Sequence, residues 1–94
     1  MSFTLELSDE QDALRAKTRA LCTVAMLAST GQQLQLGVYV QAARRQGASE
    51  EEVREVLRQV AVYAGFPSAW NALATMGRAL EDLKLPEDAE EASR

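Results

Sequence analysis

Three glycines divide the chain into four stretches whose apolar residues recur at helical spacing. Glycine tolerates a positive φ and is common just after a helix, and it occurs here at Gly31, Gly47 and Gly65. Within each stretch apolar residues return every three or four positions, as on one face of an α-helix. The pattern therefore predicts an all-α fold with four main helices. The predicted helices span residues 8–29, 32–46, 49–64 and 67–83.

Local capping signals predict where three of these helices begin. Ser49 is followed three residues later by Glu52, the capping-box pattern in which the hydroxyl and the carboxylate each accept a free backbone N–H. Ser8 and Gln11 form the same pattern before the first helix. Pro67 suits the first turn of the fourth helix, because its missing N–H needs no partner there.

The apolar positions predict one buried face on each helix. The expected buried positions are Leu14, Leu21, Cys22, Ala25 and Met26; Leu34, Leu36, Val38, Tyr39, Val40, Ala42 and Ala43; Val53, Val56, Leu57, Val60, Ala61 and Ala64; and Trp70, Leu73, Ala74, Met76, Gly77 and Leu80. These faces are wide, and a chain this short buries only about 60–65% of its unfolded surface. We therefore expect helix–helix interfaces between subunits of an obligate homo-oligomer.

Length and composition exclude several classes of protein. With 94 residues, of which 47% are hydrophobic and 26% charged, the chain is predicted to form one soluble domain over residues 1–94. It has no histidine and one cysteine, Cys22. A histidine-containing zinc site, a Ser-His-Asp triad and a Cys-x-x-Cys motif are therefore impossible within one chain. We expect no metal and no cofactor.

The net charge of −4 is concentrated near the C-terminus. Residues 86–94 carry four acidic residues and one arginine and are interpreted as a solvated acidic tail, and residues 1–7 alternate over too short a stretch to predict a strand. No face gathers enough basic residues to bind nucleic acid, and no apolar run approaches the roughly 20 residues that cross a bilayer. Since the N-terminus also lacks a signal-peptide pattern, we expect a cytoplasmic protein without nucleic-acid or membrane partners.

Residues 44–72 carry several spaced features in a defined order. These are Gly47, the cap from Ser49 to Glu52, the run 55–57, Gln59 and the turn Tyr63-x-Gly65-x-Pro67. Together with the preceding segment 18–30, they resemble the carboxymuconolactone decarboxylase family, which includes the alkylhydroperoxidase-D-like proteins. The resemblance covers about residues 12–80. It implies an alkylhydroperoxidase-D-like helical domain that assembles as a trimer or hexamer of small chains.

The resemblance also implies where the family's catalytic groups would lie. The glutamate, two cysteines and histidine of the peroxidase branch would fall at Ala20, Gln32, Gln35 and Tyr39, so all four groups are missing. Peroxidase activity through a thiol pair is excluded, because one thiolate must attack the peroxide and a second must resolve the product. The decarboxylase branch keeps the histidine. Tyr39 occupies its position here, and a tyrosine phenol, whose pKa in model peptides is about 10, can donate a proton but is a poor base at neutral pH.

Six residues are candidates for a functional site. The catalytic candidates are Tyr39 as proton donor and Arg19 as carboxylate anchor; the substrate-binding candidates are Cys22, Tyr63, Trp70 and Asn71. Five of the six candidates also have a purely structural interpretation. These alternatives are a satisfied core or interface hydroxyl for Tyr39, an inert buried thiol for Cys22, a helix stop at Tyr63, a core or interface anchor for Trp70 and a solvent-exposed amide for Asn71.

Two functions remain open. One is the binding of a small organic acid or lactone in an intersubunit pocket, with a decarboxylase-like lyase reaction by proton transfer if the protein is active. The alternative is a non-catalytic helical oligomer that keeps the family scaffold without its chemistry. The missing histidine favours the second, whereas the turn Tyr63-x-Gly65-x-Pro67 fits both.

Overall fold

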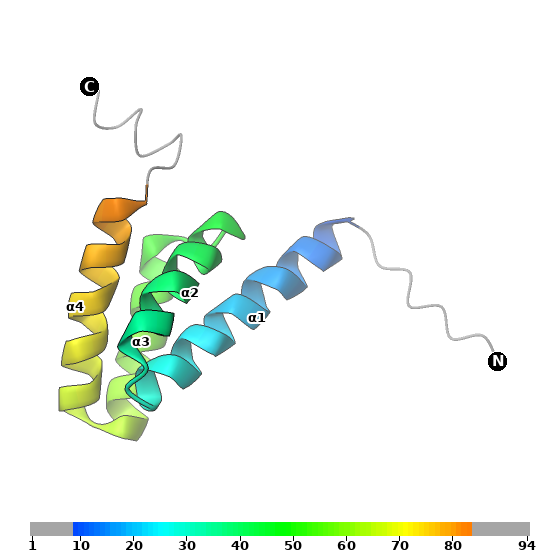
Figure 1. The fold of residues 1–94 in the computed structure, drawn as a ribbon. Helices are drawn as coiled ribbons and strands as arrows, with labels where there is room; N and C mark the ends of the chain where they lie inside the picture. The colour runs from blue at the N-terminus through cyan, green and yellow to red at the C-terminus, as the bar shows by residue number, and fades with distance from the viewer. Residues whose placement is uncertain (1–8, 84–94) are drawn as a thin grey trace.

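A computed structural model describes residues 9–83, which form four α-helices and no strand (Figure 1). The helices are α1 (Asp9–Ser29), α2 (Gln33–Arg45), α3 (Glu50–Ala64) and α4 (Phe66–Asp82). The predicted all-α fold with four main helices is confirmed, with boundaries within one or two residues of those expected. Ser8, the segment 1–7 and the acidic tail 86–94 lie outside the described residues. Within 9–83, no helix is both long and apolar enough to cross a membrane.

The predicted boundary signals act as expected. Gly31, Gly47 and Gly65 all have a positive φ, of 73°, 98° and 95°. The capping box at α3 is complete, since the Glu52 backbone N–H donates to Ser49 Oγ at 3.0 Å and the Ser49 N–H donates to Glu52 Oε1 at 2.9 Å. These local interactions explain why short-range sequence patterns located the helix ends so well.

The four helices form a bundle in which α1 and α4 each pack against both α2 and α3. The α1–α2 and α3–α4 turns lie at the same end of the molecule, the lower end in Figure 1. The N-terminal half of α1 extends beyond the other helices, and residues 9–19 include no buried side chain. Burial on α1 begins at Ala20.

The core is built mainly from small and branched aliphatic side chains. The fully buried side chains of largest volume are Leu36, Leu57, Val24, Val40 and Val53. The prediction was right for α3, where Val53, Leu57 and Val60 are buried. On α2 it was right for Leu36, Val40 and Ala43, whereas Leu34, Val38 and Tyr39 are exposed.

The predicted buried faces of α1 and α4 need correction. On α1, Leu14, Cys22 and Met26 are exposed, and the buried residues are Ala20, Val24 and Ala28. On α4, Met76 is buried as predicted, but Trp70, Leu73, Ala74 and Gly77 are exposed, and the other buried residues are Ala69, Ala72, Thr75 and Ala79. Both helices are apolar on more than one face, so periodicity alone did not determine which face turns inward.

Gly37 of α2 faces Thr75 of α4. A Cβ built at Gly37 would lie 3.7 Å from Cγ2 of Thr75, which is ordinary van der Waals contact. The buried Thr75 hydroxyl is hydrogen-bonded to Oε1 of Gln33, and Gln41 Nε2 donates to the carbonyl of Ala79 at 3.0 Å. Polar groups at this helix contact are thus paired across it, as buried polar groups must be to avoid a desolvation cost.

Candidate functional site

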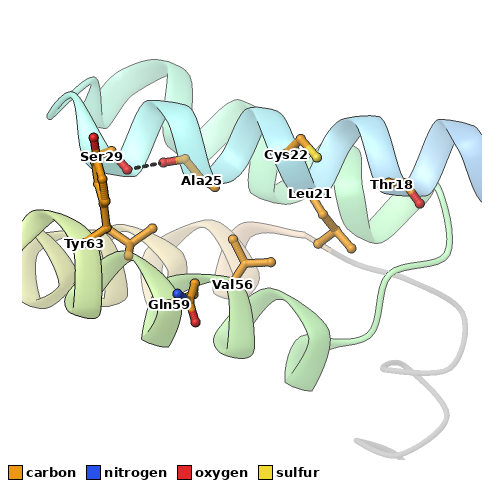
Figure 2. A pocket seen from close by; sticks show the side chains of 9 residues that line it. Thr18, Leu21, Cys22, Ala25, Ser29, Val56, Gln59 and Tyr63 are labelled. Atoms are coloured by element: carbon orange, nitrogen blue, oxygen red, sulfur yellow. Dashed lines mark hydrogen bonds between the residues drawn. The ribbon is translucent and has the colours of Figure 1, made fainter.

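An open groove of about 490 Å³ runs between α1 and α3 (Figure 2). Its lining residues are Thr18, Leu21, Cys22, Ala25 and Ser29 from α1, and Val56, Gln59, Val60 and Tyr63 from α3. The aliphatic side chains of Leu21 and Val56 point toward each other across the groove. A largely apolar concave surface with a few polar groups is typical of small-molecule sites.

The polar groups of the groove are hydroxyls and one amide. The Tyr63 side chain extends from α3 toward α1, where its hydroxyl end lies beside Ser29 (Figure 2). The Ser29 hydroxyl donates to the carbonyl of Ala25 at 2.7 Å. Thr18 and Gln59 complete the polar lining, and none of the described residues that line the groove is charged.

A second hollow of about 550 Å³ on α1 adjoins the groove. It is lined by Leu14, Arg15, Thr18, Arg19 and Cys22, and it shares Thr18 and Cys22 with the groove. Neither guanidinium has a hydrogen bond or ion pair to another group of residues 9–83. Two unpaired cations one helical turn apart thus lie next to the apolar groove, where an anion could meet them.

The structure brings three of the six candidate residues together. Cys22 and Tyr63 line the groove, and Arg19 lines the adjoining hollow. The thiol of Cys22 is exposed, because its position on α1 faces away from the buried side at Val24 and Ala28. Cys22 is therefore not an inert buried thiol in this chain.

The other three candidates lie elsewhere. Trp70 and Asn71 line a separate hollow of about 350 Å³ with Phe66 and Pro67 at the start of α4. The Phe66 and Trp70 rings are 5.7 Å apart between centroids and tilted by 35°. Tyr39 on α2 is 41% exposed. It does not line the groove, the hollow that holds Arg19 or the hollow at the start of α4. Its hydroxyl has no hydrogen bond to residues 9–83.

Four polar lining residues were not among the predicted site residues: Arg15, Thr18, Ser29 and Gln59. A signal for three of them was present in the sequence. Arg15, Thr18 and Ser29 recur at helical spacing with Cys22, which was itself a candidate. Gln59 comes from a different helix, so only the packing of α3 on α1 could reveal it.

The perturbed carboxylates belong to the capped end of α3 and not to the groove. The Ser49 backbone N–H, and then Lys17, lower the pKa of Glu52 below its usual value of 4.5. Hydrogen bonds from Arg58 and Arg54 lower the pKa of Glu51 in the same way. Within residues 9–83 no three potential metal ligands cluster. These charges are therefore engaged in capping and surface ion pairs, which contribute little to stability when exposed.

The fold and the groove define a small all-α domain with an apolar site beside two arginines that have no partner among residues 9–83. Residues 3–76 match the sequence profile of the carboxymuconolactone decarboxylase family, and the chain belongs to this family. The resemblance seen in the sequence is confirmed.

Two curated relatives are decarboxylases. The chain is 30% identical over 74 residues to the nitrosuccinic acid decarboxylase of Metarhizium robertsii, a match that covers 79% of this chain and 52% of that protein. It is 29% identical over 66 residues to the 4-carboxymuconolactone decarboxylase of Acinetobacter baylyi, covering 70% of this chain and 49% of that protein. The chain spans about half the length of the curated relatives it matches.

Proposed function

We propose that this protein binds a small organic acid or lactone in the groove between α1 and α3, with a second copy of the chain completing the pocket. The observation that carries the proposal is the continuity between the apolar groove and the hollow that holds Arg19. A ligand with an apolar body and a carboxylate matches both parts. The groove is open in one chain, so a neighbouring subunit of a trimer or hexamer is needed to exclude water.

Arg19 anchors the carboxylate in this proposal. Its guanidinium is free of partners within the described chain and can form a bidentate, charge-assisted pair with a carboxylate. Tyr63 donates a hydrogen bond from the opposite wall of the groove. Cys22 contacts the ligand where the groove meets the adjoining hollow. The relatives named as decarboxylases support an acid as the ligand.

A decarboxylase-like reaction needs a proton donor as well as a binding site. Loss of CO2 leaves a carbanion that must be protonated, and a phenol with an ordinary pKa of about 10 can supply the proton. Tyr39 is the donor expected from the family pattern, but it does not line the groove of its own chain. In this proposal Tyr39 acts from the neighbouring subunit, or Tyr63 within the groove takes its place.

A non-catalytic helical oligomer is the second candidate function. It is favoured by the absence of any histidine and by the unpartnered Tyr39 hydroxyl, which no described residue orients for proton transfer. Both candidates share the oligomer. They differ only in whether the groove binds an acid.

A thermal-shift titration with small monocarboxylates, dicarboxylates and lactones separates the two candidates. We expect at least one acid to raise the Tm of the wild-type chain, since a ligand that binds only the folded state at about 100 times its Kd stabilises it by roughly 2.7 kcal/mol. Arg19→Gln should abolish the shift. Arg54→Gln is the matched control, because Arg54 pairs with Glu51 on the surface of α3 and lines no part of the groove.

Two results would contradict the binding proposal. If no acid or lactone shifts the Tm of a folded oligomer, the protein is a helical assembly without the family's ligand. If an acid binds and Arg19→Gln responds as strongly as Arg54→Gln, the anchor is wrongly assigned.

A further inference from the structure

Charged residues are unevenly distributed along the described chain. Two runs, residues 20–43 and 59–77, contain no Asp, Glu, Lys or Arg. Every charged residue within 9–83 lies in the first half of α1, between residues 44 and 58, or from Arg78 onward. Long uncharged runs are unusual in a chain with 26% charged residues, so their position in the fold is informative.

The fold brings most of both runs to one end of the bundle, whereas residues 40–43 of the first run lie at the other end of α2. The first run contains the α1–α2 turn, and the second contains the α3–α4 turn. These two turns lie together at the lower end of Figure 1, opposite the α2–α3 turn with its arginines and glutamates. We call residues 20–39 and 59–77 the uncharged end.

Nine of the ten large hydrophobic side chains that are exposed in the described chain belong to the uncharged end, and only Leu14 lies outside it. The nine are Met26, Leu34, Val38, Tyr39, Val62, Tyr63, Phe66, Trp70 and Leu73. They include all four aromatic residues of the range 9–83. Aromatic enrichment with charge depletion is typical of the buried core of a protein interface.

We propose that the uncharged end is the surface through which copies of this chain associate. When identical surfaces meet, charged residues near the symmetry axis approach their own copies and are desolvated without an opposite partner. A surface without charges avoids both costs. The exposed polar groups here are uncharged ones such as those of Gln35 and Asn71, which can hydrogen-bond across a contact.

This surface also reaches the groove. Seven of the nine residues that line the groove between α1 and α3 lie in the uncharged end, all except Thr18 and Val56. A second copy bound here covers that part of the groove, while Arg15 and Arg19 remain at the charged side. The inference rests on the proposed function for the existence of an oligomer, and it adds the surface that forms it.

A membrane surface is the other partner that takes up exposed apolar side chains. Membrane-surface helices place lysine and arginine beside their apolar face, where these meet anionic headgroups. The uncharged end contains no such residue, and the whole chain carries a net charge of −4. A second copy of the chain is therefore the occupant that the charge distribution favours.

Light scattering of the full chain and three variants tests this surface. Val62 and Leu34 are 79% and 80% exposed in one chain, so we expect Val62→Glu and Leu34→Glu to keep the fold of that chain. Gln46→Glu is the control, since it adds a carboxylate at an exposed side chain outside the uncharged end that lines neither the groove nor the adjoining hollow. We expect the two end variants to raise the dissociation constant about 100-fold or more, because each buries an unpaired carboxylate, and the control to associate like wild type.

A second readout needs no variant. Trp70 is the only tryptophan of the chain and lies on the uncharged end. We expect its fluorescence to shift to longer wavelength on dilution, over the same concentration range in which the mass falls. Circular dichroism checks that each variant keeps its helices. If an end variant unfolds, the Trp70 signal of the wild-type chain shows whether the uncharged end is buried in the oligomer.

Two results would overturn the inference, and they can be told apart. A wild-type chain that stays monomeric at micromolar concentration, with or without binding to vesicles of anionic phospholipid, removes both the proposed oligomer and this surface. A wild-type oligomer that both end variants leave intact, with Trp70 remaining solvent-exposed, removes only this surface and leaves the proposed pocket to another contact.

Discussion

The ammonium of Lys17 on α1 lies 3.0 Å from Oε2 of Glu52, whose other oxygen accepts the backbone N–H of Ser49 at 2.9 Å. One carboxylate thus completes the cap of α3 and also ties α3 to the extending half of α1. The groove lies between these same two helices. The capping box, a feature of local sequence, therefore takes part in positioning the candidate site.

Removing the cap hydroxyl should destabilise the domain. We expect Ser49→Ala to lower the free energy of unfolding by about 1 kcal/mol, because the Glu52 backbone N–H loses its acceptor. Urea unfolding followed by circular dichroism measures the change. Ser68→Ala is the control: Ser68 lies in the first turn of α4 with no side-chain hydrogen bond to residues 9–83, and its loss should change stability by less than about 0.5 kcal/mol. If Ser49→Ala and Ser68→Ala lowered the free energy of unfolding by the same small amount, the Ser49 hydroxyl would not stabilise the domain.

Acid should weaken the same cap. The pKa of Glu52 is lowered in the folded chain, first by the Ser49 N–H and then by Lys17, so its stabilising contribution is present above the unfolded value of 4.5. That contribution is lost as the pH falls from 4.5 through the lower folded pKa. The urea midpoint of the wild-type chain should therefore drop over this range, and that of Glu52→Gln should drop less. Parallel pH profiles for the two chains would contradict the assignment.

The turn between α3 and α4 requires glycine. Gly65 has φ 95° and ψ 162°, a region almost closed to other residues, so Gly65→Ala should cost about 1–3 kcal/mol of stability. Gly77 lies inside α4 with no atom within 4 Å of an added Cβ. Gly77→Ala should instead stabilise the chain by about 0.5–1 kcal/mol, because alanine is the better helix former. Thermal unfolding of the two variants should move in opposite directions.

A buried and an exposed leucine, on α3 and α2, should respond differently to truncation. Leu57 is fully buried on α3, and Leu57→Ala should cost about 2–5 kcal/mol through lost burial and a cavity. Leu34→Ala, at an exposed site, should change the unfolding free energy of one chain by less than about 0.5 kcal/mol. Urea unfolding at low protein concentration measures both. A large loss for Leu34→Ala under those conditions would mean that Leu34 belongs to the core.

Alkylation of Cys22 should report occupancy of the groove. Its thiol is the only one in the chain, is exposed and lines both the groove and the adjoining hollow. An acid that binds as proposed should slow its reaction with an uncharged maleimide about tenfold at roughly ten times Kd. Arg19→Gln should remove the protection, whereas Arg54→Gln should keep it. An acid that raises Tm without protecting Cys22 would bind elsewhere.

The helix ends could be predicted from the sequence more completely than the residues of the candidate site. The helix ends depend on glycines, the proline and a capping box, which act within a few residues, and these were predicted correctly from Ser49, Gly65 and Pro67. Of the candidate site residues, Arg19, Cys22 and Tyr63 meet around one groove, whereas Trp70 lines another hollow. Spacing along one helix could group Arg19 with Cys22. It could not place Tyr63 opposite them, because that depends on how α3 packs on α1.

The sequence by itself determined the helices, their ends, the chemistry that is impossible without histidine and the membership of the carboxymuconolactone decarboxylase family. Tertiary structure alone decided which apolar face of each helix is buried. On α4 the small residues Ala69, Ala72 and Ala79 turn inward and Trp70 stays outside, because close helix packing selects small side chains where several faces are apolar. The antiparallel arrangement also gathered most of two distant uncharged runs at one end, a proximity that no local pattern encodes.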